Sequence, residues 1–418
     1  MNKKKIAIVG SGISGLTCGY YLNDECDIKM FEAGNYIGGH TNTIEVDSGD
    51  SPLNIDTGFI VFNDWTYPNF IKMLDETGVQ SQVSDMSFSV KCEQTGLEYN
   101  GTDTNKLFAQ RRNIFKSSFW KMVLDILRFN KEGLEWVSKA AEDDSTTLGE
   151  FLDSGNFSEM FRKYYGYPIT AAIWSAGDED VRNFPLRFFM NFFKNHGMLS
   201  VNERPVWRVI KGGSKSYIPA LTKRWSSKIH LNTPVLSVER LGNGVVVTTK
   251  LGKETFDKII FACHSDQALK ILEQPTPQEK EILEALPYQA NEAVLHTDET
   301  ILPKRRLAWA AWNYHILKEK RSTAALTYNM NILQSLATDK TYNVTLNYTE
   351  AIDPNKIIKK IKYMHPRFTL DGIKAQKRHA EISGQNNTYY CGAYWRYGFH
   401  EDGVVSALKV IDQVRPES

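Results

Sequence analysis

Apolar residues along this chain recur with a period near two in some segments and near 3.6 in others, and glycine turns separate them. Residues 6–9 form a continuous apolar run, which is typical of a parallel strand buried on both faces. Apolar positions then recur at helical spacing over 13–22, and a second short strand is predicted over 28–31. Strand and helix alternating in this way predict an α/β fold of the Rossmann type.

A dinucleotide fingerprint lies between these predicted elements, and it consists of Gly10, Gly12, Ile13, Ser14, Gly15 and Glu32. The first glycine permits a tight turn, the second lets the backbone approach a pyrophosphate, and the third lets helix and strand pack closely. The helix N-terminus presents free N–H groups to that pyrophosphate. Glu32 can bind a ribose diol, and its charge would repel a 2′-phosphate, which argues against NADP. We therefore predict a dinucleotide site here, the alternative being a purely structural βαβ unit.

Length and composition limit the classes of protein to which this chain can belong. A chain of 418 residues exceeds the usual size of one hydrophobic core, so two domains are expected. The formal net charge of +1 gives no reason to expect nucleic acid binding. The five cysteines are odd in number and lack paired spacing, which predicts reduced thiols in a cytoplasmic protein. We expect no metal site, because the histidines lack ligand spacing, and no signal peptide or membrane-spanning segment.

The middle of the chain, from about residue 64 to 204, has a different character. A helix is predicted over 69–78 and strands over 84–99. Residues 111–131 then form a basic amphipathic segment with aromatic side chains, in which six cations face one acidic residue, Asp125. Such a segment can lie on an anionic membrane surface, at the inner face of the membrane in a cytoplasmic protein. The alternative, which we favour, is an ordinary domain helix with a solvated basic face.

Two aromatic segments follow, at 164–176 and 187–198, and they suit either the wall of a pocket for an apolar substrate or a helical core. Of these two interpretations the sequence favours the core. Beyond residue 264, a helix with a capping box is predicted at Thr276 and Glu279. Strands are predicted around 292–298, 307–312 and 323–330, and a late helix over 355–362. Cys263 and His264 adjoin each other, but neighbouring strand residues face opposite ways, so a catalytic pair is not expected.

Further glycine motifs connect this chain to a known superfamily. The sequence carries Glu32-Ala33, then Gly38-Gly39, and then Asp56-Thr57-Gly58. With the fingerprint, this pattern resembles the superfamily of flavin-containing amine oxidases, phytoene desaturases and protoporphyrinogen oxidases. One departure is His40, which stands where the superfamily has arginine, so that a titratable donor replaces a permanent charge.

The resemblance implies FAD, held without a covalent bond. It assigns cofactor contacts to the fingerprint residues and to Ala33, Gly39, His40, Thr41, Thr57, Gly58, Val235, Gly392, Gly403 and Val404. The last three belong to a C-terminal strand, glycine loop and helix, whose N-terminus would meet the cofactor. The superfamily's acidic residue after the first glycine of that loop is replaced by Ala393-Tyr394. The same loop brings candidate substrate residues toward the flavin, namely Tyr394, Trp395, Tyr397 and His400.

The resemblance also implies a division of the chain. A discontinuous FAD-binding domain of the Rossmann type is expected from residues 1–75, 205–264 and 375–418. An inserted α+β substrate domain is expected from residues 76–204 and 265–374.

The motifs GGHTNT, DTGF and GFHEDG are similar to those of a bacterial subgroup associated with methyltransferases of the cyclopropane fatty acid synthase type. This similarity implies an FAD-dependent oxidoreductase that desaturates an apolar substrate, such as a fatty-acyl or other lipid chain. Two alternatives stay open. One is an amine oxidase acting on a small amine or polyamine, although no motif for its flavin-facing lysine is found. The other is a non-catalytic FAD-binding partner of another enzyme.

Overall fold

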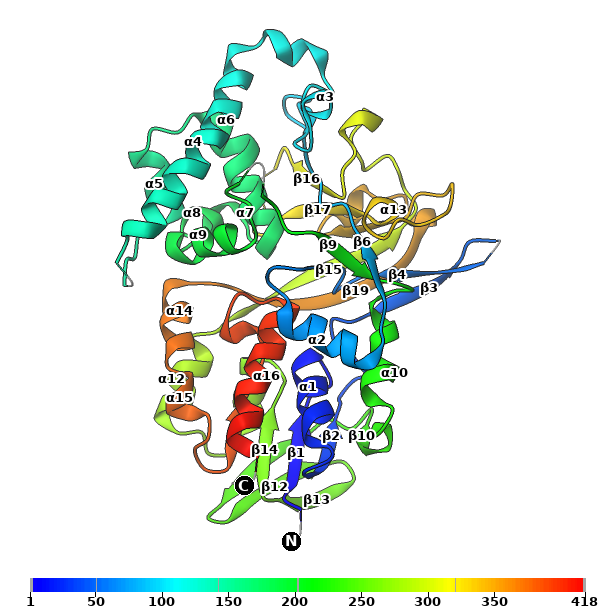
Figure 1. Ribbon diagram of the computed structural model, residues 1–418, viewed down its shortest axis with the longest axis vertical. Coiled ribbons are helices and arrows are strands. Elements are labelled where there is room, and N and C mark those ends of the chain that lie inside the picture. The colour runs from blue at the N-terminus through cyan, green and yellow to red at the C-terminus, as the bar shows by residue number, and fades with distance from the viewer. Residues whose placement is uncertain (1–2, 50, 142, 201–202, 320, 416–418) are drawn as a thin grey trace.

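The apolar run at residues 6–9 lies at the centre of a five-stranded parallel sheet. In the computed structural model, which describes residues 3–49, 51–141, 143–200, 203–319 and 321–415, the strand order is β10-β2-β1-β14-β20 (Figure 1). These strands are β1 (Lys5–Val9), β2 (Asp27–Phe31), β10 (Ile229–His230), β14 (Lys258–Phe261) and β20 (Thr388–Tyr390). The sheet therefore draws on three separate parts of the chain. The predicted outer limits of the FAD-binding domain, residues 1 and 418, lie outside the described residues.

Helices cover one face of this sheet, and they bury a common apolar core. They are α1 (Ile13–Leu22), α2 (Pro68–Thr77), α10 (Tyr217–Thr222) and α16 (His400–Val414). The other face packs against an antiparallel sheet of β11 (Ser237–Leu241), β12 (Gly244–Thr249) and β13 (Gly252–Phe256). It also packs against α11 (Ser265–Ile271), α12 (Pro277–Glu284), α14 (Leu370–Lys377) and α15 (His379–Ile382). The capping box predicted at Thr276 and Glu279 is confirmed at the start of α12.

A second, seven-stranded sheet comes from the segments between those parts. Its order is β19-β15-β18-β17-β16-β7-β8. The strands are β7 (Phe88–Cys92), β8 (Glu98–Asn100), β15 (Tyr288–His296), β16 (Trp312–Ile316), β17 (Ala325–Asn329), β18 (Asn343–Leu346) and β19 (Ile357–Pro366). Small sheets join the two halves, and they contain β3 (Thr43–Asp47), β4 (Pro52–Asp56), β5 (Phe62–Asn63), β6 (Ser81–Val83) and β9 (Trp207–Ile210). The whole is a mixed α/β fold, as predicted.

The late helix predicted over 355–362 is wrong. A short 3-10 turn at Pro354–Lys356 leads into strand β19, which pairs antiparallel with β15 along its length. β19 is an edge strand, and Lys359, Lys360 and Lys362 lie along it. Lysines are good helix formers, but on an edge strand they also discourage pairing with another chain. Pairing with β15 therefore makes this segment a strand, although its lysines would also suit a helix.

Helices form an outer layer above the seven-stranded sheet (Figure 1). They are α3 (Thr104–Leu107), α4 (Ser117–Lys139), α5 (Leu148–Ser154), α6 (Glu159–Phe161), α7 (Tyr167–Trp174), α8 (Asp178–Arg182) and α9 (Leu186–Asn195), while α13 (Met330–Leu333) lies near the sheet edge. Most of the aromatic side chains in 164–176 and 187–198 are buried in one core with this layer. The core interpretation of those segments is confirmed for most of their length.

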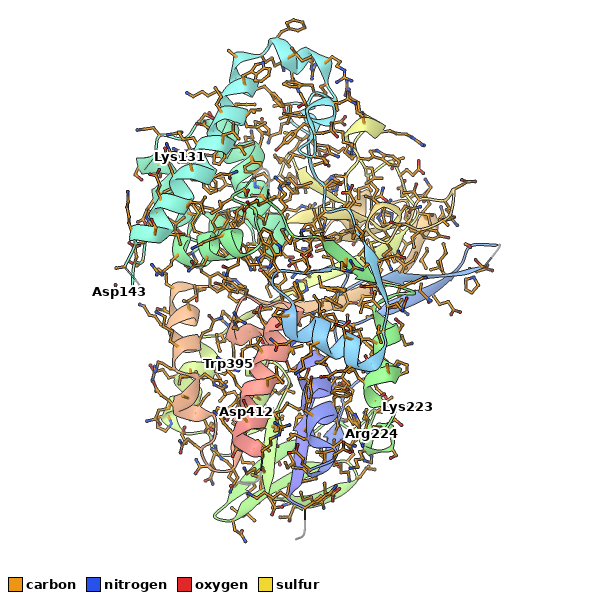
Figure 2. All side chains as sticks on the ribbon, in the orientation of Figure 1. Lys131, Asp143, Lys223, Arg224, Trp395 and Asp412 are labelled. Atoms are coloured by element: carbon orange, nitrogen blue, oxygen red, sulfur yellow. The ribbon has the colours of Figure 1, made fainter. Side chains whose placement is uncertain are left out.

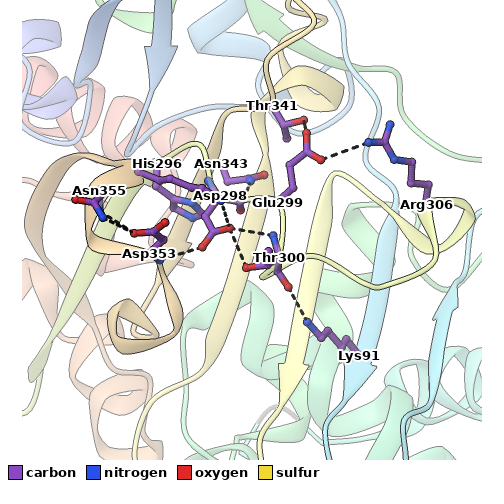
Figure 3. Close-up of polar contacts among 11 residues, drawn as sticks. Lys91, His296, Asp298, Glu299, Thr300, Arg306, Thr341, Asn343, Asp353 and Asn355 are labelled. Atoms are coloured by element: carbon purple, nitrogen blue, oxygen red, sulfur yellow. Dashed lines mark hydrogen bonds and ion pairs between the residues drawn. The ribbon is translucent and has the colours of Figure 1, made fainter.

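A buried polar row crosses the seven-stranded sheet. His296 Nε2 lies 2.8 Å from Thr345 Oγ1, which lies 2.8 Å from Thr327 Oγ1, which lies 2.8 Å from His315 Nε2. The backbone N–H of Asp298 donates to His296 Nδ1, so His296 Nε2 carries the proton and donates into the row. The carboxylate of Asp298 accepts further bonds from the following loops (Figure 3). These bonds lower the pKa of Asp298 and fix the loop after β15.

Candidate functional site

The loop after β1 is shaped by two glycines. Gly10 has a φ of +103°, and a Cβ there would lie 2.9 Å from the carbonyl oxygen of Ala262. A Cβ on Gly15 would lie 2.0 Å from the carbonyl oxygen of Gly10, so helix α1 can approach the strand only because Gly15 has no side chain. Gly12 is different, because no protein atom lies within 4 Å of its Cβ position. The backbone at Gly12 thus has open space in front of the first turn of α1.

Glu32 is held in place at the end of β2 by this same loop. Its Oε2 accepts hydrogen bonds from the backbone N–H of Ser11, at 2.8 Å, and from Ser11 Oγ, at 2.6 Å. Its Oε1 accepts a hydrogen bond from the backbone N–H of Gly34 at 2.7 Å. The carboxylate is therefore fixed beside the glycine loop, and it lines the cavity described below.

A second loop, residues 38–41, closes on the first. The backbone N–H of Gly38 donates to the carbonyl of Ser11, and a Cβ on Gly39 would lie 3.3 Å from Gly12 Cα. His40 follows, and its buried Nε2 has no hydrogen-bond partner among the described residues. Burial, and then the neighbouring His365, His264 and His400, hold the pKa of His40 well below its usual value. His40 is therefore neutral at neutral pH, unlike the arginine of the superfamily pattern.

Behind this loop lies a polar cluster. Thr57 Oγ1 donates to the carbonyl of Asn42, and a Cβ on Gly58 would lie 2.2 Å from the carbonyl oxygen of His40. Thr41 and Tyr217 are hydrogen-bonded to each other, and both lie within hydrogen-bond distance of His400 Nε2. Thr41 and Thr57 do not line the cavity themselves but support the residues that do.

The C-terminal loop and helix α16 complete this wall. Ser14 Oγ donates to the carbonyl of Gly403, and a Cβ on Gly403 would lie 2.7 Å from Ile13 Cγ2. The start of α16 therefore lies against the start of α1. Gly392 lines the cavity just after β20, whereas Val404 is buried in the core behind it.

The four candidate substrate residues separate into two groups. Tyr394, Tyr397 and His400 line the cavity. Trp395 does not, because its ring packs against His379 and Tyr394 in the core that covers the other face of the parallel sheet. His400 is stacked on Phe59, with ring centroids 3.5 Å apart, and burial lowers its pKa to about 3.

One cavity of about 840 Å³ connects these parts. Glu32, Ala33 and Val235 line one end, together with Lys270 of α11, whose C-terminal end bridges to β11. The other end extends beneath the seven-stranded sheet and the helical layer. Its wall includes Ile173 and Trp174, from the segment 164–176 whose alternative interpretation was a pocket wall. It also includes residues that no sequence motif indicated, namely Ile60, Tyr288, Trp312, Tyr328, Met364, His365 and Phe368.

The histidines in the cavity are neutral. Burial lowers the pKa of His264, and burial and the neighbouring His264 lower that of His365 to about 4. Burial also raises the pKa of the Cys263 thiol to about 12, so this cysteine stays protonated beside His264. Of the described residues that line the cavity, Glu32 is the one carboxylate and Lys270 the one lysine, and no arginine is among them. The described residues hold no cluster of three or more His, Cys, Asp or Glu side chains placed to bind a metal ion.

The glycine-loop end of the cavity fits a dinucleotide. Open space in front of Gly12 admits a pyrophosphate against the N-terminus of α1, where backbone N–H groups lack helical partners. His40 follows Gly39 in the loop that closes on Gly12, and the Nε2 of its neutral ring has no partner among the described residues, so this nitrogen is open to a bound group. The fixed carboxylate of Glu32 can accept from a ribose diol. No covalent attachment is needed for such a site.

Comparison with known proteins gives the family to which this site corresponds. The family model described as flavin containing amine oxidoreductase matches residues 13–362. No curated protein matches the chain at the level of sequence.

Solved structures agree on the fold. A fatty acid isomerase from P. acnes that produces CLA is 15% identical, with a TM-score of 0.71, over 98% of both chains. Cyclohexylamine oxidase from Brevibacterium oxydans is 14% identical, with a TM-score of 0.70, over 99% of this chain and 100% of that one. Putrescine oxidase bound to putrescine is 13% identical, with a TM-score of 0.68, over 98% of both chains.

Proposed function

This chain belongs to the flavin-containing amine oxidoreductase family and is an FAD-dependent oxidoreductase, and on that premise we propose that it dehydrogenates an apolar chain, such as a fatty-acyl chain of a lipid. In the proposed reaction two adjacent carbons lose one hydrogen as a hydride and the other as a proton, which is released to solvent, and they gain a double bond. When bound, FAD supplies the acceptor for the hydride, and the protein supplies position and environment.

The observation that carries the proposal is the lack of charge in the substrate end of the cavity. Both charged lining residues that the structure describes, Glu32 and Lys270, lie at the nucleotide end. The remaining wall is formed largely by aromatic and aliphatic side chains, with neutral histidines among them. Such a wall gains about 25 cal/mol for each Å² of apolar surface that it covers.

A charged substrate fits this wall poorly. Burying an unpaired ammonium or carboxylate is costly, because the ion loses its hydration without gaining a partner. A polyamine would place a cation where no described carboxylate faces it. A fatty acid would likewise have to keep its carboxylate at the cavity mouth. The acyl chain of a lipid whose head group stays outside the cavity buries neither an ammonium nor a carboxylate.

The fold itself does not decide between these substrates. Among its structural neighbours are an oxidase of cyclohexylamine and an isomerase of fatty acids, and their identities of 14% and 15% extend to the fold alone. An amine oxidase with a lysine near the flavin is disfavoured here, because the one lysine among the described lining residues is Lys270, at the nucleotide end.

Several residues of this chain would hold FAD for that chemistry. The glycine loop and the N-terminus of α1 would bind the pyrophosphate, Glu32 the ribose, and His40 a phosphate oxygen. Gly392 and the N-terminus of α16 line the adjoining part of the cavity. Phe59, stacked on His400, and the helical layer beyond it would exclude water from the reacting carbons.

The proposal is tested by product analysis. The FAD-loaded protein is incubated anaerobically, in equal amounts, with a saturated phosphatidylcholine in detergent, with cyclohexylamine or with putrescine. We expect mass spectrometry to find a lipid product that has lost two hydrogens, in an amount stoichiometric with reduced flavin. Oxidation of either amine without any change in the lipid would contradict the proposal, and a flavin that stays oxidised with all three would favour a non-catalytic role.

A further inference from the structure

The outer face of helix α4 and the turn before it expose large apolar side chains. Phe115, at the end of the 3-10 turn Arg111–Phe115, is 89% exposed, and Leu124 is 62% exposed. Trp120, Leu127 and Leu134 are also exposed. In sequence these helical positions are separated by four, three and seven residues, so they form one stripe along α4. We call Phe115 and this stripe the apolar face of α4.

The helix does not need this face for its own packing. Its opposite side buries Phe119, Met122 and Phe129 in the core of the helical layer. A Cβ on Gly133 would lie 2.8 Å from Met190 Sδ, so α4 also packs closely on α9. A helix that is apolar on both faces is usually covered on both. Large exposed apolar patches on soluble proteins mark sites of association with a protein or a membrane.

Cations surround the apolar face, and they lack acidic partners. Arg112, Lys116, Lys121 and Lys131 are exposed, and the described residues give them neither an ion pair nor a side-chain hydrogen bond. Asp125 is buried and paired with Arg128 at 3.0 Å, and Glu132 lies 3.6 Å from the same arginine. Over residues 111–139 seven lysines and arginines stand against three acidic residues, so the local formal charge is +4, whereas the whole chain has a formal net charge of +1.

We propose that this face docks on the surface of an anionic lipid bilayer. A stripe of Trp and Leu side chains with cations at its edges matches a membrane interface, in which apolar groups enter the acyl boundary and cations meet anionic head groups. The structure contains no described helix that is long and apolar enough to cross a bilayer. The contact is therefore peripheral.

A second copy of this chain is a poorer occupant. A two-fold contact places the same patch of each copy against the other, so these four cations would face the same cations. Like charges brought together across an interface cost several kcal/mol. A bilayer with anionic lipids has the opposite charge, and charge complementarity therefore selects it.

The position of α4 suits this role. Figure 1 shows α4 in the outer helical layer, at the end of the molecule opposite both chain termini, and Figure 2 marks Lys131 in that layer. Helix α9, on which α4 packs, carries Phe188, whose ring lies 4.8 Å from Phe368 and 4.5 Å from Tyr397 in the cavity wall. Docking itself requires no particular chemistry in that cavity and goes beyond the proposed function.

The test is sedimentation of the full-length FAD-loaded protein with vesicles. The vesicles are phosphatidylcholine alone, or an equimolar mixture of phosphatidylcholine and phosphatidylglycerol. We expect binding to the mixed vesicles, and its loss at about 0.5 M NaCl, where the Debye length is roughly 4 Å. The variant Lys116→Gln/Lys121→Gln/Lys131→Gln should bind at least 10-fold more weakly, because each cation near such a surface contributes about fivefold.

A second variant tests the apolar contribution. Phe115→Ser/Leu124→Gln/Leu127→Gln keeps every charge and should also lose at least 10-fold in binding. Matched controls change exposed residues elsewhere and should bind like the wild type. They are Lys250→Gln/Lys253→Gln/Lys280→Gln for charge and Val83→Gln/Leu241→Gln/Leu251→Gln for apolar area.

Three results would overturn the proposal. The first is equal sedimentation with neutral and mixed vesicles. The second is binding by both patch variants that equals binding by their controls. The third is concentration-dependent dimers in light scattering that the Phe115→Ser/Leu124→Gln/Leu127→Gln variant loses, together with no vesicle binding by the wild type, which would make this face a contact between two copies.

Discussion

Glu32 accepts both hydrogen bonds that Ser11 can donate, one from the backbone N–H at 2.8 Å and one from Oγ at 2.6 Å. Through this pair the end of β2 is fixed to the glycine loop after β1. The carboxylate is thereby preorganised for a ribose before any cofactor binds, so little ordering cost remains to be met on binding.

Replacing Glu32 with alanine should therefore weaken FAD binding. Loss of charge-assisted hydrogen bonds costs about 1.5–3 kcal/mol, which corresponds to a Kd higher by roughly 10- to 100-fold. Flavin fluorescence quenching on the apoprotein measures this Kd. Glu239→Ala, at an exposed site on β11, is the matched control and should leave Kd unchanged. An unchanged Kd in Glu32→Ala would show that FAD does not use this carboxylate.

Gly12 and Gly15 allow a sharper test of where the cofactor lies. A Cβ on Gly12 meets no protein atom within 4 Å, whereas one on Gly15 would lie 2.0 Å from the carbonyl oxygen of Gly10. Gly12→Ala should keep the Tm of the apoprotein and lose FAD affinity, because its methyl group enters the space for the pyrophosphate. Gly15→Ala should lower the free energy of unfolding by about 2 kcal/mol or more.

Thermal unfolding of both apoproteins, followed by FAD titration, separates these effects. A Gly12→Ala protein that binds FAD as tightly as the wild type would place the pyrophosphate somewhere other than in front of α1.

Stability should fall in mild acid, because histidines are buried in neutral form. Burial lowers the pKa of His296 to about 4 and that of His315 to about 3, against about 6.5 in the unfolded chain. Below pH ~6.5 the unfolded chain takes up protons that the folded protein excludes. Each histidine therefore removes up to about 1.4 kcal/mol of stability per pH unit as the pH falls toward its folded pKa.

Urea unfolding between about pH 7.5 and 5 measures this slope. His315→Gln should reduce the slope of the free energy of unfolding against pH by the contribution of about one proton. Thr327→Val is the control, because it removes the same hydrogen bond from the row without removing a titrating group, and its slope should match the wild type. Equal slopes in His315→Gln and the wild type would mean that His315 is protonated in the folded protein.

A charge placed in the substrate end of the cavity should slow the reaction of an apolar substrate. Ile173 is half-buried at the end of α7 and lines the cavity. Ile173→Asp should lower the rate of flavin reduction by lipid at least 10-fold, because the acyl chain would have to desolvate a carboxylate. Ile173→Leu is the control and should stay within about threefold. Stopped-flow absorbance measures both rates, and equal rates would remove Ile173 from the substrate path.

The nucleotide half of the site could be predicted from sequence because it is built from local signals. Gly10 to Glu32 is one continuous strand, turn, helix and strand, and each residue in it has a mechanical reason that is visible in the sequence. His40 could be identified as a departure from the superfamily pattern. Its neutral state could not, because the low pKa of His40 depends on burial and then on His365 and His264, all of which come from distant segments.

The substrate half could not be predicted because its wall comes from distant elements. Tyr288, Trp312 and Tyr328 stand on three strands of the seven-stranded sheet, and no sequence spacing relates them. The C-terminal loop predicts both Tyr394 and Trp395 as substrate residues, and their rings pack together with centroids 5.2 Å apart, but only Tyr394 lines the cavity. The helix predicted over 355–362 was wrong for the same reason, because the pairing of β19 with β15 overrides the local preference of this segment for a helix.

Anaerobic titration of the FAD-loaded protein, followed by visible absorbance, tests the central claim most directly. A phospholipid with saturated acyl chains, presented in detergent, should bleach the oxidised flavin band in proportion to the lipid dehydrogenated. Cyclohexylamine and putrescine at the same concentrations should leave the band intact. Bleaching by either amine while the lipid has no effect would contradict this account of the cavity.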